Sequence, residues 1–123
     1  LAGDVARTVA AHGITGITGV PPLWSQVADA TWPPGASASV RYIATTGGVM
    51  PPTLLKKLRT VFPNARPYLM YGLTEAFRST YLPPEEADAR PESIGKAIPN
   101  AEILVLREDG TPCAPGEPGE LVH

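Results

Sequence analysis

Hydrophobic residues recur at helical spacing in three stretches of this chain. In the first stretch, Val5 and Val9 share one face with His12, as the 3.6-residue period of a helix requires. Asp4 can cap this helix, and Gly13 suits the left-handed position that ends one. The pattern therefore predicts a helix between Asp4 and Gly13.

Two further helices are predicted to begin at proline pairs, because proline is favoured in the first turn of a helix. One begins at Pro21-Pro22 and the other at Pro51-Pro52. Their apolar faces are formed by Leu23, Trp24, Val27 and Ala28 in one helix and by Leu54, Leu55, Leu58, Val61 and Phe62 in the other.

Runs of β-branched and aromatic residues between glycines and prolines predict short strands. These strands are expected at residues 14–20, 40–46, 68–71, 101–106 and 119–122. Asp109-Gly110 predicts a hairpin turn between the last two strands. Residues 77–100 are polar and irregular, and no element is expected there.

The order of these elements predicts the fold class. Helices and strands alternate at first, which indicates an α/β fold of βαβ units around a parallel sheet, and a β-rich segment follows. We expect an α/β subdomain over residues 1–76, an irregular connection over 77–100 and a truncated β-hairpin segment over 101–123. Because the chain starts without methionine and ends inside a predicted strand, we expect an internal fragment whose cut sheet edges favour self-association.

Composition excludes several classes of function. A hydrophobic content of 43%, a charged content of 18% and a net charge of −2 are typical of a globular domain. Lysines and arginines are scattered, which argues against nucleic-acid binding, and no apolar run is long enough to be a transmembrane segment. The single cysteine, Cys113, excludes an internal disulfide and fits a reducing compartment, so we expect a cytoplasmic protein.

Two predicted strands end at glycines where an α/β sheet binds its ligands. Ligands of open α/β sheets lie at the C-terminal ends of the strands, and Gly47-Gly48 and Gly72 occupy such positions. Glycine lets the main chain lie flat against a ligand. We therefore expect both loops to border one ligand crevice, although each could also be a plain turn.

The loop that follows the second of these strands carries three side chains suited to nucleotide chemistry. Tyr71 offers a flat ring to a nucleobase, Thr74 offers a hydroxyl to a phosphate oxygen, and Glu75 offers a carboxylate to Mg²⁺. The alternative for this motif alone is a capped turn, with Tyr71 and Leu73 in the core and Glu75 in solvent.

Five segments, in order along the chain, resemble the adenylate-forming enzymes, which include acyl- and aryl-CoA ligases, firefly luciferase and peptide-synthetase adenylation domains. The segments are GVPPL at 19–23, TGGVMP at 46–51, YGLTE at 71–75, SIGKAIP at 93–99 and GEPGEL at 116–121. Residues 71–84 are also similar to acyl-CoA ligases associated with exosortase and exopolysaccharide gene sets.

This resemblance implies a set of site residues. Those implied to hold the nucleotide and one wall of the acyl slot are Gly47, Gly48, Val49, Tyr71, Gly72 and Thr74. Thr74 and Glu75 are implied to be catalytic, with Thr74 on the α-phosphate and Glu75 on the metal. Arg78 departs from the small or apolar residue common in the family, and it can meet a polar acyl group or lie on the surface.

The implied enzyme is an AMP-forming acyl-CoA ligase that uses ATP, Mg²⁺ and coenzyme A. It converts a small-molecule carboxylic or fatty acid to an acyl-adenylate and then to a thioester. The chain holds neither the family's phosphate loop nor its catalytic lysine, so we expect it to be inactive in isolation. Two alternatives remain: a peptide-synthetase adenylation domain that loads a carrier protein, and a non-catalytic α/β interaction module.

Overall fold

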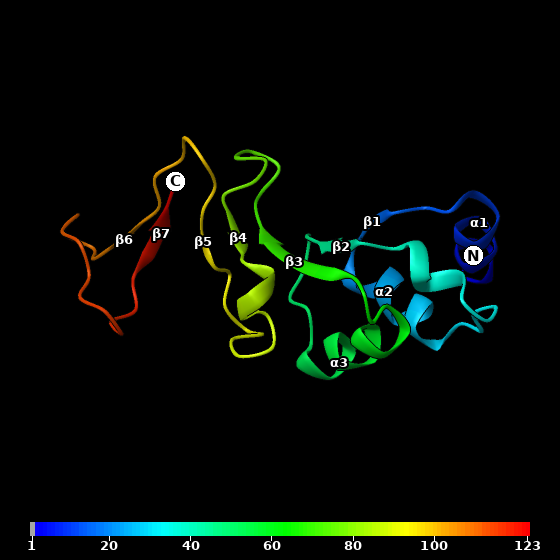
Figure 1. Ribbon diagram of the computed structural model, residues 1–123. Helices are drawn as coiled ribbons and strands as arrows, with labels where there is room; N and C mark the ends of the chain where they lie inside the picture. Colours follow the sequence, from blue (N-terminus) through cyan, green and yellow to red (C-terminus); the bar gives the residue numbers. More distant parts are fainter. Residues whose placement is uncertain (1) are drawn as a thin grey trace.

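A five-stranded sheet organises most of the molecule (Figure 1). The computed structural model describes residues 2–123. The strands lie in sequence order and are β1 (Gly16–Gly19), β2 (Tyr42–Thr45), β3 (Arg66–Tyr71), β4 (Thr80–Leu82) and β5 (Lys96–Ala97). The first three pair in parallel, and β4 and β5 add antiparallel strands. The sheet is therefore mixed, with the predicted parallel part at its N-terminal end.

Three helices accompany the parallel strands, as the hydrophobic pattern predicts. They are α1 (Ala2–His12), α2 (Pro21–Asp29) and α3 (Pro52–Val61). Helix α2 and the 3-10 turn η1 (Ala36–Ser39) connect β1 to β2, and α3 connects β2 to β3. The predicted βαβ units and the α/β fold class are confirmed.

The expected start of α1 is wrong by one short turn. Asp4 does not precede the helix but lies in its first turn, where its carboxylate accepts a hydrogen bond from Arg7. An acidic side chain in this position interacts favourably with the helix dipole. The sequence pattern located the helix correctly and misplaced only its first residue.

Residues 77–100 are more ordered than the sequence suggests. They contain β4, the 3-10 turn η2 (Pro84–Glu86) and β5. Leu82 pairs with Leu69 of β3, and the side chains of Thr80 and Leu82 are buried while Tyr81 between them is half-buried. Three residues are too few to show a strand period, so this strand depends on pairing with β3 and not on a local pattern.

The hydrophobic core lies between the parallel strands and the helices. Trp24 and Val27 of α2 and Leu58 of α3 are fully buried, and Phe62 just after α3 joins them. The Phe62 ring meets two indole rings edge-on, with centroids 6.4 Å from Trp24 and 4.8 Å from Trp32. This aromatic cluster fixes α2 and α3 against each other.

Strands β6 (Leu104–Leu106) and β7 (Glu120–Val122) form a separate antiparallel pair. Figure 1 shows this pair beyond β5, at the end of the molecule opposite α1. Asp109 and Gly110 form the predicted turn, in which the Gly110 N–H donates to the Arg107 carbonyl oxygen at 2.9 Å. After the turn, Pro112 forms an antiparallel bridge with Leu106 at the end of β6. The chain then continues through residues 113–119 before it pairs with β6 again as β7.

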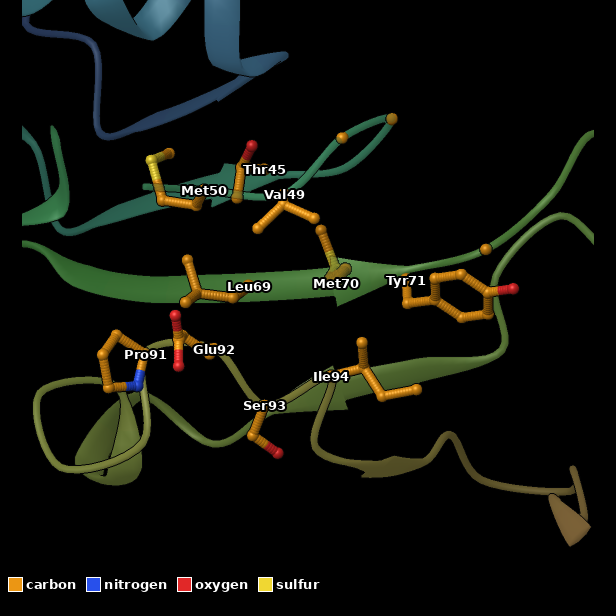
Figure 2. A pocket seen from close by; sticks show the side chains of 13 residues that line it. Thr45, Val49, Met50, Leu69, Met70, Tyr71, Pro91, Glu92, Ser93 and Ile94 are labelled. Carbon is orange, nitrogen blue, oxygen red and sulfur yellow. The ribbon is translucent and has the colours of Figure 1, made fainter. Parts of the chain in front are cut away.

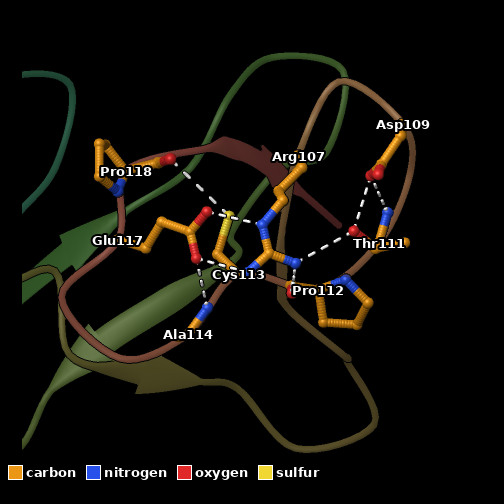
Figure 3. A network of polar contacts seen from close by, with 8 residues as sticks. All are labelled: Arg107, Asp109, Thr111, Pro112, Cys113, Ala114, Glu117 and Pro118. Atoms are coloured by element: carbon orange, nitrogen blue, oxygen red, sulfur yellow. Dashed lines mark hydrogen bonds and ion pairs between the residues drawn. The ribbon is translucent and has the colours of Figure 1, made fainter.

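An ion pair organises the long connection between β6 and β7 (Figure 3). Nε and Nη2 of Arg107 donate to the two carboxylate oxygens of Glu117, both at 2.6 Å, and Nη1 donates to the Pro112 carbonyl at 2.7 Å. The Arg107 hydrogen bonds hold the pKa of Glu117 below its usual value, and the same contact raises the pKa of Arg107. The guanidinium thus ties Pro112 and Glu117 of the connection to the residue that follows β6.

None of the helices formed by residues 2–123 combines the length and the apolar character needed to cross a membrane.

Candidate functional site

A cavity of about 220 Å³ lies where β2 and β3 end (Figure 2). Thr45 of β2 pairs in register with Leu69 of β3, so the segments that follow the two strands leave the sheet side by side. The cavity is lined by Thr45, Gly47, Gly48, Val49, Met50, Leu69, Met70, Tyr71, Gly72, Pro91, Glu92, Ser93 and Ile94. Its volume is below the range of about 300–1,000 Å³ for sites that enclose a whole ligand, so it suits one part of a larger ligand.

The first wall of the cavity combines the bare main chain of a glycine pair with the side chain of Val49. Gly47 has a φ of 77°, in the left-handed region that favours glycine. A Cβ atom on Gly48 would lie 3.3 Å from Cγ of Pro21, at the start of α2. The glycine pair therefore sits tightly against α2 and leaves its peptide groups next to the cavity. Val49 lines the same wall with 79% of its surface exposed, so its side chain is free to contact a ligand.

The second wall is the end of β3. Figure 2 shows Met70 and Tyr71 following Leu69 along the strand, with the Tyr71 ring at one end of the row. The Ser79 N–H donates to the Tyr71 carbonyl at 2.9 Å and closes the loop of residues 72–78. A Cβ atom on Gly72 would lie 2.1 Å from the Phe77 carbonyl oxygen, so this loop folds back directly over Gly72.

Thr74 and Glu75 lie in this loop, outside the cavity wall. Both side chains are exposed, and neither lines the cavity. Among residues 2–123 no group of three or more His, Cys, Asp or Glu side chains could hold a metal ion. Glu75 can supply one carboxylate, which suffices for Mg²⁺ only when phosphate oxygens and water complete its shell.

The simple alternative of a capped turn describes this loop only in part. Glu75 does face solvent, but Leu73 is 52% exposed and not in the core. Arg78 is half-buried, and its guanidinium carbon lies 5.6 Å from the centroid of the Phe77 ring. Arg78 does not line the cavity.

A third wall, residues 91–94, was missed by the sequence reasoning. The resemblance includes SIGKAIP at 93–99, but no site role was assigned to it. The hydroxyl of Thr80 donates to the Ile94 carbonyl at 2.6 Å and fastens this segment to β4. The segment reaches the cavity only because β4 pairs with β3, which the sequence pattern does not show.

The predicted site residues thus divide into two groups. Gly47, Gly48, Val49, Tyr71 and Gly72 surround one cavity, as the expected crevice requires. Thr74 and Glu75 project from the adjoining loop. Their roles toward a nucleotide stay predictions.

Replacing Thr45 with valine is expected to stabilise the protein by about 1 kcal/mol. Thr45 is 3% exposed, and its hydroxyl has no hydrogen-bond partner within residues 2–123. A buried hydroxyl without a partner costs about 1–3 kcal/mol, and valine keeps the shape without the polar atom. Urea denaturation measures the change. The matched control is Thr80→Val, which removes a made hydrogen bond and should destabilise by about 1 kcal/mol. Equal losses in both variants would contradict the prediction.

Parallel strands in an α/β sheet whose ends carry glycines around a cavity form the arrangement in which open α/β sheets bind their ligands. This chain belongs to the family of AMP-binding enzymes, whose sequence pattern matches residues 2–123. The resemblance to adenylate-forming enzymes is therefore confirmed.

Individual relatives and solved structures agree with the family. The chain is 34% identical over 120 residues to a 2-succinylbenzoate–CoA ligase of Bacillus velezensis. This match covers 96% of this chain and 23% of the relative. It is 29% identical over 123 residues to malpinin synthetase of Mortierella alpina. That match covers 96% of this chain and 2% of the relative.

Among solved structures, VinN superposes with a TM-score of 0.85 at 34% identity, over 95% of this chain and 30% of VinN. O-succinylbenzoate coenzyme A synthetase (MenE) of Bacillus subtilis, solved with ATP and a magnesium ion, gives 0.83 at 29% identity, over 98% of this chain and 25% of MenE. The chain thus spans less than a third of each of these proteins.

Proposed function

We propose that this chain forms the base-binding part of an AMP-forming acid–CoA ligase. The observation that carries the proposal is the shared cavity of the Gly47-Gly48 loop and the Tyr71 end of β3. Bare main chain on one side and an aromatic ring at the end of the other suit a flat nucleobase. The cavity is too small for a whole nucleotide, which fits a site completed by other parts of a larger enzyme.

In this proposal a carboxylate oxygen of the acid attacks the α-phosphorus of ATP. The bond from that phosphorus to the pyrophosphate oxygen breaks, and pyrophosphate leaves with the electron pair. The thiol of coenzyme A then loses its proton to solvent and attacks the carbonyl carbon of the acyl-adenylate as a thiolate; the bond from that carbon to the phosphate oxygen breaks, and AMP leaves with the electron pair. A carboxylate needs no general base, so the site works by positioning and by neutralising charge.

The described residues supply three contacts to this reaction. The glycine pair and Tyr71 hold the base, the Thr74 hydroxyl donates to an oxygen of the α-phosphate, and the Glu75 carboxylate is a ligand of Mg²⁺. A magnesium ion held by Glu75 and by phosphate oxygens would help to neutralise the phosphate charge during the transfer. The exposed positions of Thr74 and Glu75 beside the cavity leave both free for these contacts.

The proposed substrate is a small carboxylic acid. Its support is that VinN was solved with L-aspartate and MenE with an acyl-adenylate of o-succinylbenzoate.

The similarity to malpinin synthetase favours a second candidate, an adenylation domain that loads a carrier protein. Supplying coenzyme A or a carrier-protein thiol to the full-length protein separates the two. We place the enzyme in the cytoplasm, because a single cysteine, Cys113, forms no internal disulfide and fits a reducing compartment. The narrower likeness to exosortase-associated ligases stays a prediction.

Replacing Glu75 with glutamine in the full-length protein is expected to slow adenylate formation about a hundredfold, because a preorganised charge contact to the reacting phosphate is lost. Acid-dependent exchange of labelled pyrophosphate into ATP measures this step, with a panel of small acids. Thr74→Ala should behave in the same way. The control is Glu108→Gln, an exposed glutamate on the β6–β7 connection. If both loop variants exchange at the wild-type rate, the proposed function of this segment is wrong. The 123-residue chain alone should show no exchange.

A further inference from the structure

One carboxylate faces an otherwise uncharged cavity. Of the 13 residues that line it in the described chain, Glu92 is the only aspartate, glutamate, lysine or arginine. Figure 2 shows the Glu92 carboxylate directed toward Leu69 of β3. Glu92 is exposed, so its carboxylate is accessible to a group that occupies the cavity.

The Glu92 carboxylate has no partner of its own. Within residues 2–123 no hydrogen bond or ion pair involves it, although cations lie close by in the sequence. Arg90 pairs with Glu86 at 3.7 Å, and the Lys96 ammonium lies 5.7 Å from the centre of the Tyr81 ring. The Glu92 carboxylate is therefore bound by no described residue and is accessible to a ligand as well as to water.

The segment that carries Glu92 is held in place. The Ser93 N–H donates to the Arg90 carbonyl at 3.0 Å, and the Gly95 N–H donates to the Ser93 hydroxyl at 3.0 Å. Thr80 fastens the Ile94 carbonyl at 2.6 Å. These bonds preorganise the wall, so little ordering is needed when a ligand binds.

The distance along β3 matches the size of a purine. Leu69, beside Glu92, and Tyr71 are two residues apart, which is about 7 Å along a strand. Figure 2 shows Met70 between Leu69 and Tyr71 along the strand, so a base that lay along β3 from the Tyr71 ring would have its far edge on the Glu92 side. The far edge of adenine carries an exocyclic amine, which is a hydrogen-bond donor.

We propose that Glu92 accepts a hydrogen bond from the exocyclic amine of adenine and so selects 6-amino purines over 6-oxo purines. This inference rests on the proposed function, because it requires the base to lie in this cavity. An ionised carboxylate only accepts hydrogen bonds. It therefore pairs with the amine at position 6 of adenine, whereas the same position of hypoxanthine carries a carbonyl oxygen, which is a second acceptor.

The test compares AMP with IMP, which differ at this position of the base. Isothermal titration calorimetry with the full-length protein is expected to show roughly tenfold tighter binding of AMP, as the loss of a charge-assisted hydrogen bond requires. Glu92→Gln presents both a carbonyl acceptor and an amide donor, so it should accept either base. The ratio of the two dissociation constants should then fall close to one.

The matched control is Glu102→Gln, another exposed glutamate without a hydrogen-bond or ion-pair partner in the described chain but outside the cavity. It should keep the wild-type ratio. Equal binding of AMP and IMP by the wild type, or an unchanged ratio in Glu92→Gln, overturns the role of Glu92 and leaves the proposed function standing. A folded protein that binds neither AMP nor ATP overturns the proposed function, and this inference with it.

Discussion

Replacing Gly95 with alanine is expected to lower the free energy of unfolding by about 2–5 kcal/mol. Gly95 has a φ of 80°, and a Cβ atom there would lie 2.0 Å from the Tyr81 carbonyl oxygen and 2.5 Å from Cα of Leu82. The left-handed backbone costs a residue with a Cβ about 1–2 kcal/mol, and overpacking adds about 1–3 kcal/mol. Because both atoms are main chain of β4, no side-chain rotation relieves the contact. Urea denaturation followed by circular dichroism measures the loss.

Gly110 provides a matched control for this substitution. Its φ is also 80°, but no atom lies within 4 Å of the position a Cβ would take. Gly110→Ala therefore isolates the backbone cost, about 1–2 kcal/mol, from the clash. If the two alanine variants lose equal stability, the close approach of Gly95 to β4 is not what holds the third wall of the cavity.

The helices and parallel strands could be predicted because each carries its own local pattern. The apolar face of α3 and its proline start are visible within ten residues, and the same holds for α2. Strand β4 has no such signature, because Thr80 and Leu82 become buried only through pairing with β3. Local patterns define elements, while pairing between distant segments completes the sheet.

The candidate site divides in the same way. The glycine loops after β2 and β3 could be placed at one crevice because the ends of adjacent parallel strands meet. The position of Glu92 could not, since it depends on how β4 carries residues 91–94 across the cavity. The exclusion of Thr74 and Glu75 from the cavity lining also escaped the sequence, because the loop that carries them is closed by a hydrogen bond from the Ser79 N–H to the Tyr71 carbonyl, which no local pattern shows.

The aromatic cluster behind the parallel strands should be as sensitive as the third wall. Phe62→Ala is expected to cost about 3–5 kcal/mol, since the ring is 1% exposed and its removal leaves a cavity among residues that cannot fully collapse. The edge-on contacts with Trp24 and Trp32 are lost as well. The free energy of unfolding of a domain is only about 5–15 kcal/mol. We therefore expect this substitution to remove a large part of the stability of the folded state.

Guanidinium denaturation followed by tryptophan fluorescence reports this loss directly, because Trp24 and Trp32 are the two tryptophans of the chain and both contact Phe62. The chain also offers its own control, as its second phenylalanine, Phe77, is 83% exposed. Phe77→Ala should change stability by no more than about 0.5 kcal/mol. A comparable loss in both variants would mean that the packing of α2 and α3 around Phe62 does not support the parallel strands, and the cavity at their ends would then need another source of rigidity.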